Sequence, residues 1–250
     1  MRWIKGLIPT VIILLGALLL GCICYISIWG VPSFVVQRVE QALLEKGIPS
    51  HIETLKVTLW PRAVVTLKNV ELLDPEAMPE TRRPIVLLHE ADVALNWKKL
   101  IEGQVVPERV NVKGMDVSVP VDAGNLEKVF SVTGVNAELN LGRPGMVDIV
   151  KADAVVQGIR VTAQGAFSIG QDDSGDFTLT AQDMGAVREQ LNQVLNYMDR
   201  VKWPDASPPR LIVNLSDDPK GGVRVGMDLQ APVLRYGKIM VRDFLFSGDY

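Results

Sequence analysis

The chain has 250 residues, a formal net charge of -3 and 48% apolar residues. Its charges are mixed along its length and form no basic stripe, so nucleic acid is not an expected partner. Its two cysteines lie together in one apolar run and its two histidines stand alone, which excludes a disulfide framework and a Cys/His metal site.

An uncharged segment near the N-terminus is long enough to cross a membrane. Residues 6–37 contain no charged side chain. The roughly 22 residues of its core would form a helix of ~33 Å at ~1.5 Å each, against a hydrocarbon thickness of ~30 Å. We therefore predict a transmembrane helix at 7–29, preceded by a short tail at 1–6.

The residues that flank this segment predict its orientation. Arg2 and Lys5 stand before it. Tyr25 and Trp29 lie near its far end, where aromatic rings favour the membrane interface. Because positive residues stay on the cytoplasmic side, we expect the tail in the cytoplasm and the rest of the chain beyond the membrane.

Two alternatives to a stable anchor stay open. A cleaved signal peptide has an apolar core of ~7–15 residues and a small-residue cleavage site, whereas this run is longer and no such site follows it. The second alternative is a lipoprotein signal, because residues 19–22 resemble a bacterial lipobox that ends at Cys22. The chain stays apolar after Cys22, although a lipid-anchored chain normally turns polar there. The stable anchor is the favoured interpretation.

A short amphipathic helix is predicted at 32–47, directly after the membrane segment. Gly30 and Pro32 interrupt the first helix, and Gly47 followed by Pro49 ends the second. Its apolar stripe at helical spacing consists of Val35, Val36, Val39, Ala42 and Leu43.

From residue 50 the hydrophobic periodicity changes to two. Strict alternation predicts strands with one apolar and one wet face, which antiparallel sheets tolerate. We therefore predict a mainly β chain with an antiparallel domain at 50–250, interrupted by one amphipathic helix at about 184–201. The last strand reaches Tyr250 without a polar tail, so we expect the sheet to continue in a longer native chain. The alternating segments are 91–97, 135–141, 159–169, 177–181 and 223–230.

No set of catalytic residues is recognisable in the sequence. The chain contains no Gly-x-Ser-x-Gly, no phosphate-binding loop and no His-Glu-x-x-His motif. We therefore expect a protein that is not an enzyme and that uses no cofactor or metal.

Several stretches, taken in order after one membrane span, resemble the AsmA-like family of envelope proteins. The similarity extends over about residues 5–130, and beyond that point the strand pattern alone agrees. The stretches that carry it are 44–48, 57–61, 65–72, 84–103, 110–117 and 122–125.

The resemblance implies a long, curved antiparallel sheet shaped like an open gutter, as in chorein-type lipid carriers. It also implies an inner-membrane anchor in a Gram-negative envelope, a periplasmic bulk and a role in passing phospholipid or supporting outer-membrane biogenesis. Strands spaced at ~4.8 Å give only ~55 Å for a dozen strands. Because that is too short to join two membranes, the resemblance implies a longer native chain or other envelope proteins as partners.

The alternating apolar residues form a ribbon on which phospholipid acyl chains are expected to lie. Acyl surface costs ~25 cal/mol per Å² in water, and an apolar trough removes that cost. Two alternatives stay open, because the same pattern also builds the dry core of a β-sandwich and because a membrane-tethered structural adaptor needs no lipid. The candidate lipid-groove residues are Val93, Leu95, Trp97, Val110, Val112, Val117, Val135, Leu139, Leu141, Ile159, Val161, Phe167, Val225, Met227 and Leu229.

Overall fold

The structure is a computed structural model that describes residues 31–59, 61–75, 83–121, 128–143, 145–168, 181–204, 206–218 and 222–250, with the backbone alone for 181–187. The predicted tail, the predicted transmembrane helix and the residues assigned to its interfaces, Arg2, Lys5, Tyr25 and Trp29, lie outside these ranges, as does Cys22. Among the helices in the described ranges, none is both long and apolar enough to span a membrane.

The described chain consists of eleven strands and three helices, and every one of these strands joins a single sheet. The prediction of a mainly β chain is therefore confirmed. In chain order the elements are α2 (Ser33–Glu45), β1 (Ser50–Thr58), β2 (Val64–Leu73), β3 (Pro84–Leu95), α3 (Trp97–Ile101), β4 (Pro107–Pro120), β5 (Val129–Asn140), β6 (Met146–Val156), β7 (Ile159–Ser168), α4 (Ala181–Met198), β8 (Val201–Lys202), β9 (Arg210–Asp217), β10 (Val223–Tyr236) and β11 (Ile239–Asp249).

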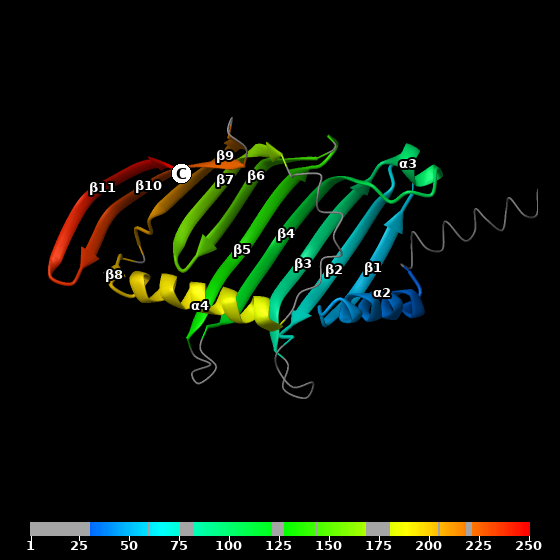
Figure 1. The fold of residues 1–250 in the computed structure, drawn as a ribbon, viewed down its shortest axis with the longest axis horizontal. Helices are drawn as coiled ribbons and strands as arrows, with labels where there is room; N and C mark the ends of the chain where they lie inside the picture. The colour runs from blue at the N-terminus through cyan, green and yellow to red at the C-terminus, as the bar shows by residue number, and fades with distance from the viewer. Residues whose placement is uncertain are drawn as a thin grey trace, which may run out of the picture.

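The sheet is long and open. Its strands lie in the order β1 to β7, then β9, β10 and β11, and the two-residue β8 pairs with the end of β10. β1 and β11 form its two edges and do not pair with each other, so the described strands make no barrel (Figure 1). No second sheet is present among the described residues to stack on the first.

One strand pair departs from the predicted antiparallel arrangement. β7 and β9 pair in parallel, from Arg160 beside Arg210 to Gly165 beside Leu215. A parallel pair needs a crossover connection, usually helical, and α4 lies between these two strands in the chain. The alternation within each strand does not report the direction of its neighbour, which is why the expectation of a wholly antiparallel sheet was wrong.

The helices also differ in detail from the expected positions. α2 occupies the stretch 32–47, where an amphipathic helix is expected, and α4 begins and ends about three residues earlier than its predicted range. Val201, assigned to that helix in the prediction, pairs with Tyr236 as part of β8. Figure 1 shows α2 and α4 along the same end of the strands and α3 at the opposite end.

Trp97 lies in a short helix and not in a strand. β3 ends at Leu95, and the side chain of Asn96 accepts a hydrogen bond of 3.0 Å from the backbone N–H of Lys99. This bond caps the first turn of α3 and ends the alternation one residue before Trp97. The prediction that Trp97 continues the strand and belongs to the apolar ribbon is therefore wrong.

Bulges in the middle of the sheet keep its apolar residues on one face. The β4–β5 ladder shifts register between Lys113 and Met115, where Gly114 has φ 66°. Glycine adopts this left-handed conformation readily, and a bulge bends the strand and increases its twist. Because the bulge adds one residue, Val112 and Val117 share a face although five positions separate them.

Candidate functional site

The candidate site is the apolar face of the sheet. Residues that pair across neighbouring strands point to the same side, so the registers show which apolar side chains form continuous rows. One such row crosses the sheet through Val65, Val93, Val110, Leu139, Ile149, Gly165, Leu215 and Val225.

A second row, next to the first, contains several small side chains. It passes through Leu67, Ala91, Val112, Ala137, Ala152, Ala163, Val213 and Met227. On the other side of this second row, larger residues pair across neighbouring strands in the order Val70, Leu88, Met115 and Val135. The alanines of the second row therefore lie between rows of larger side chains.

Most of this face is accessible to solvent. Fourteen of the fifteen candidate groove residues are half-buried, and Trp97 is exposed. Leu141 lies one residue beyond the end of β5, and its backbone N–H donates a hydrogen bond to the carbonyl of Glu108. Among the described hydrophobic residues only eight are buried, three of them the alanines Ala63, Ala91 and Ala231. The described face therefore lacks the dry core that a β-sandwich would have.

The opposite face of the sheet is polar and held together by cross-strand ion pairs. Glu90 of β3 contacts Lys68 of β2 and Lys113 of β4, and Asp92 accepts a hydrogen bond of 2.7 Å from the Thr66 hydroxyl. Hydrogen bonds from Lys113 and Lys68 lower the pKa of Glu90 to about 2. The charged and polar side chains of this face are suited to contact with water, in contrast to those of the apolar face.

The two longer helices cover only one end of the apolar face. α2 packs against β1, where Ile52 is 4% exposed and donates its backbone N–H to Glu40 at 2.7 Å. Lys128, just before β5, donates hydrogen bonds of 2.7 Å to Asn192 and Asn196 of α4. Val119, near this contact, is also buried. The helices therefore close the strand ends on one side and leave the centre of the face open.

An ion pair joins α4 to the first part of the sheet. The guanidinium of Arg188 donates hydrogen bonds of 2.8 and 2.9 Å to both carboxylate oxygens of Asp74, which follows β2. The two side chains are only 16% and 14% exposed. A single nitrogen, Nη2, makes both contacts, and this charge-assisted interaction ties α4 to the end of β2.

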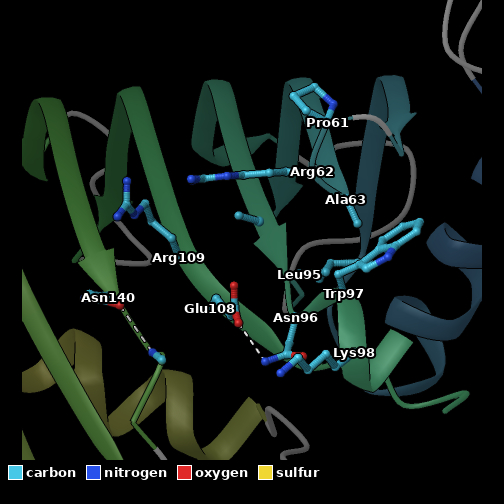
Figure 2. A pocket seen from close by; sticks show the side chains of 12 residues that line it. Pro61, Arg62, Ala63, Leu95, Asn96, Trp97, Lys98, Glu108, Arg109 and Asn140 are labelled. Atoms are coloured by element: carbon cyan, nitrogen blue, oxygen red, sulfur yellow. Dashed lines mark hydrogen bonds between the residues drawn. The ribbon is translucent and has the colours of Figure 1, made fainter. Parts of the chain in front are cut away.

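A pocket of about 650 Å³ lies at the opposite strand ends, beside α3. Its lining combines apolar side chains with three cationic residues, Arg62, Lys98 and Arg109, and one carboxylate, Glu108. Figure 2 shows Arg62, from the turn before β2, extending toward Arg109 of β4. Glu108 accepts a hydrogen bond of 2.6 Å from the Asn96 amide. The pocket therefore carries a local excess of positive charge on a chain that is negative overall.

This pocket opens on the polar side of the sheet and was not predicted. Arg109 pairs with Ala94 and Asn140, which alternate with the apolar residues of their strands. The sequence signal that could have indicated this end is the adjacency of Trp97 to Lys98 and Lys99. The alternation over 91–97 predicts a strand position for Trp97 and so gives no indication of a pocket there.

The described residues contain no group of three or more His, Cys, Asp or Glu side chains placed to hold a metal ion. No family model, no curated protein and no solved structure matches this chain, so the resemblance to AsmA-like proteins rests on the sequence stretches named above.

Proposed function

We propose that this protein holds phospholipid acyl chains on the apolar face of its sheet. In this proposal the N-terminal segment anchors it in the inner membrane of a Gram-negative envelope, the bulk is periplasmic, and lipid passes along the face in support of outer-membrane biogenesis, as the AsmA-like resemblance implies. No chemical step is required, so the proposed role is not enzymatic. The observation that carries the proposal is the continuous apolar face, whose side chains stay partly exposed because no second sheet covers it among the described residues.

Energetic considerations support an apolar ligand on this face. Contiguous apolar patches above a few hundred Å² are rare on monomeric soluble proteins and mark interaction sites when present. Each acyl CH₂ removed from water contributes ~0.8 kcal/mol. Contact with about eight methylene groups would therefore contribute ~6 kcal/mol, and the headgroup could stay in water at the rim.

The dimensions of the face also suit acyl chains. Nine spacings separate the ten strands from β1 to β11, which gives ~43 Å at ~4.8 Å per strand. One leaflet of hydrocarbon is ~15 Å deep, half of the bilayer core. The face therefore exceeds one acyl chain in length, although it is too short to join two membranes. A complete bridge would need a longer native chain or partner proteins.

The proposal can be tested by photocrosslinking from two adjacent residues of β4. Val112 lies in the small-residue row on the apolar face, and Asn111 points to the polar face. A benzophenone side chain would be placed at each position in the full chain, expressed in a Gram-negative host. We expect phospholipid adducts, identified by mass spectrometry, at position 112 and none at position 111. Absence of lipid at both positions, with the protein folded, contradicts the proposal.

One observation favours a second candidate, a membrane-tethered structural adaptor. β11 forms a sheet edge among the described strands, and Met240, Leu245 and Phe246 on it are 57%, 73% and 53% exposed. Exposed strand edges accept added strands from other proteins. The same benzophenone placed at Leu245 separates the two roles, because an adaptor gives protein adducts there while position 112 stays free of lipid.

A further inference from the structure

The α3 end of the sheet exposes a cluster of large apolar side chains. Trp97, Ile101, Val105 and Val106 are 47%, 72%, 71% and 38% exposed, and all four lie in or just after α3. The connection is ordered by the Asn96 cap and by backbone hydrogen bonds from Gln104 to Lys99 and from Asn96 to Val106, and the four side chains stay exposed on it. An exposed group of this kind marks a candidate contact site for an apolar environment outside the described chain.

Cationic side chains line the pocket beside Trp97, a member of this apolar group. Arg62 and Lys98 form no ion pair within the described residues, and Arg109 contacts Glu138 only at 3.8 Å. Lys99 pairs with Glu102 at 2.9 Å in an exposed position. The three pocket cations against one carboxylate leave a net positive charge at this end, whereas the whole chain carries -3.

We propose that the α3 end docks on an anionic phospholipid bilayer, with Trp97, Ile101 and Val105 inserted at the interface and Arg62, Lys98 and Arg109 against headgroup phosphates. Tryptophan favours the membrane interface, and apolar residues flanked by Lys and Arg are the pattern of interfacial segments. An uncharged apolar protein surface would satisfy the apolar residues alone and would leave Arg62 and Lys98 without counter-charges. The bilayer satisfies both requirements.

The position of the α3 end in the fold agrees with such docking. The inference rests on the proposed function, because the membrane anchor is part of that proposal. The proposed span ends at residue 29, and Val31 is already hydrogen-bonded to Leu55 of β1 at 2.9 Å. α3 follows β3, two strand spacings or ~10 Å from β1. The anchor would thus hold the α3 end close to a bilayer, and docking would bring one end of the apolar face to the lipid it takes up or releases.

The test uses the full chain in vesicles, with a polarity-sensitive NBD fluorophore on a single cysteine. Cys22 and Cys24 are first replaced by alanine, and Ile101→Cys carries the probe. Leu245→Cys is the matched control, because Leu245 is 73% exposed against 72% for Ile101 and lies on the distant β11. Vesicles contain either phosphatidylcholine alone or phosphatidylcholine with phosphatidylglycerol.

We expect blue-shifted emission, quenched by spin-labelled lipid, for the probe at Ile101 in the anionic vesicles only. Each Lys or Arg near an anionic surface contributes ~1 kcal/mol, so replacing Arg62, Lys98 and Arg109 together by Gln should lower the docking constant on the order of 100-fold. High salt should weaken docking as the Debye length falls from ~10 Å at 0.1 M to ~3 Å at 1 M.

Three results would overturn the inference: no response at Ile101, an equal response in neutral vesicles, or an equal response at Leu245. If Ile101→Cys fails to fold by circular dichroism, the probe moves to Val105→Cys, which is exposed outside the helix. If no docking is seen but lipid adducts at Val112 persist, the docking inference fails and the proposed function stands. Loss of those adducts with docking intact would instead contradict the proposed function.

Discussion

Replacing Leu139 by glutamate distinguishes an open apolar face from a sealed core. Leu139 is the penultimate residue of β5, paired with Val110 and Ile149, and is half-buried. Full burial of a leucine contributes ~1.5–3 kcal/mol, so losing a half-buried one costs ~1 kcal/mol. The new carboxylate can stay hydrated on an open face. We therefore expect Leu139→Glu to lower Tm by only ~2–4 °C.

The effect on lipid should be much larger. A charge at this position excludes acyl contact over about three methylene groups, which removes ~2.4 kcal/mol of binding. That loss corresponds to a roughly 50-fold lower affinity for the lipid. To measure this change in lipid binding, the full chain would be extracted into nanodiscs made of a distinguishable lipid. The phospholipid that it retains would then be quantified by mass spectrometry. Thr133→Glu is the control, because Thr133 is exposed on the polar face of the same strand and should change neither quantity.

The result that would refute this reasoning is a large loss of stability. An unpaired carboxylate in a dry core costs several kcal/mol, enough to unfold a marginally stable domain. If Leu139→Glu unfolds the protein while Thr133→Glu does not, the face is sealed and lipid holding fails. Unchanged lipid in a folded Leu139→Glu protein would also contradict the proposal.

Two further predictions concern the sheet itself. Gly165→Ala should destabilise the protein by ~3 kcal/mol or more in urea unfolding, because at φ 134° its Cβ would overlap the backbone carbonyl of Leu215 across the parallel pair. Gly134→Ala, with open space around it at φ 63°, should cost only ~1 kcal/mol, and equal losses would contradict the model of the β7–β9 contact. Because the pKa of Glu90 falls from 4.5 to about 2 on folding, its ion pair with Lys113 favours the folded state above pH 4.5. That contribution should disappear as pH falls from about 4.5 to about 2, and Glu90→Gln should flatten the decline of the urea midpoint over this window.

Most strands were predictable from sequence because they have one apolar and one wet face. Of the segment 177–181, also predicted as a strand, residues 177–180 lie outside the described ranges and Ala181 begins α4. Ile159, Val161, Ala163 and Phe167 alternate in the sequence and lie on one face in the structure. The bulges were not predictable in the same way, since a single glycine such as Gly114 shifts the alternation by one without changing the composition of the strand.

The parallel pairing and the open face required the structure. Which strand lies beside β7 depends on how the chain crosses back through α4, and the alternation of β9 would be identical in either direction. Likewise, alternation indicates that a face is apolar but does not indicate what covers it. Trp97 illustrates a third limit, because one capping residue, Asn96, overrides a periodic pattern that matches a strand.

An unclosed sheet also has a consequence for how this architecture can vary in evolution. A barrel must keep strand number, tilt and shear mutually consistent, whereas an unclosed sheet has no such condition. Insertion of one hairpin next to β10 or β11 would lengthen the surface by ~10 Å and leave every other pairing intact. Related chains can therefore lengthen the sheet by duplicating hairpins, while the existing strand pairings stay unchanged.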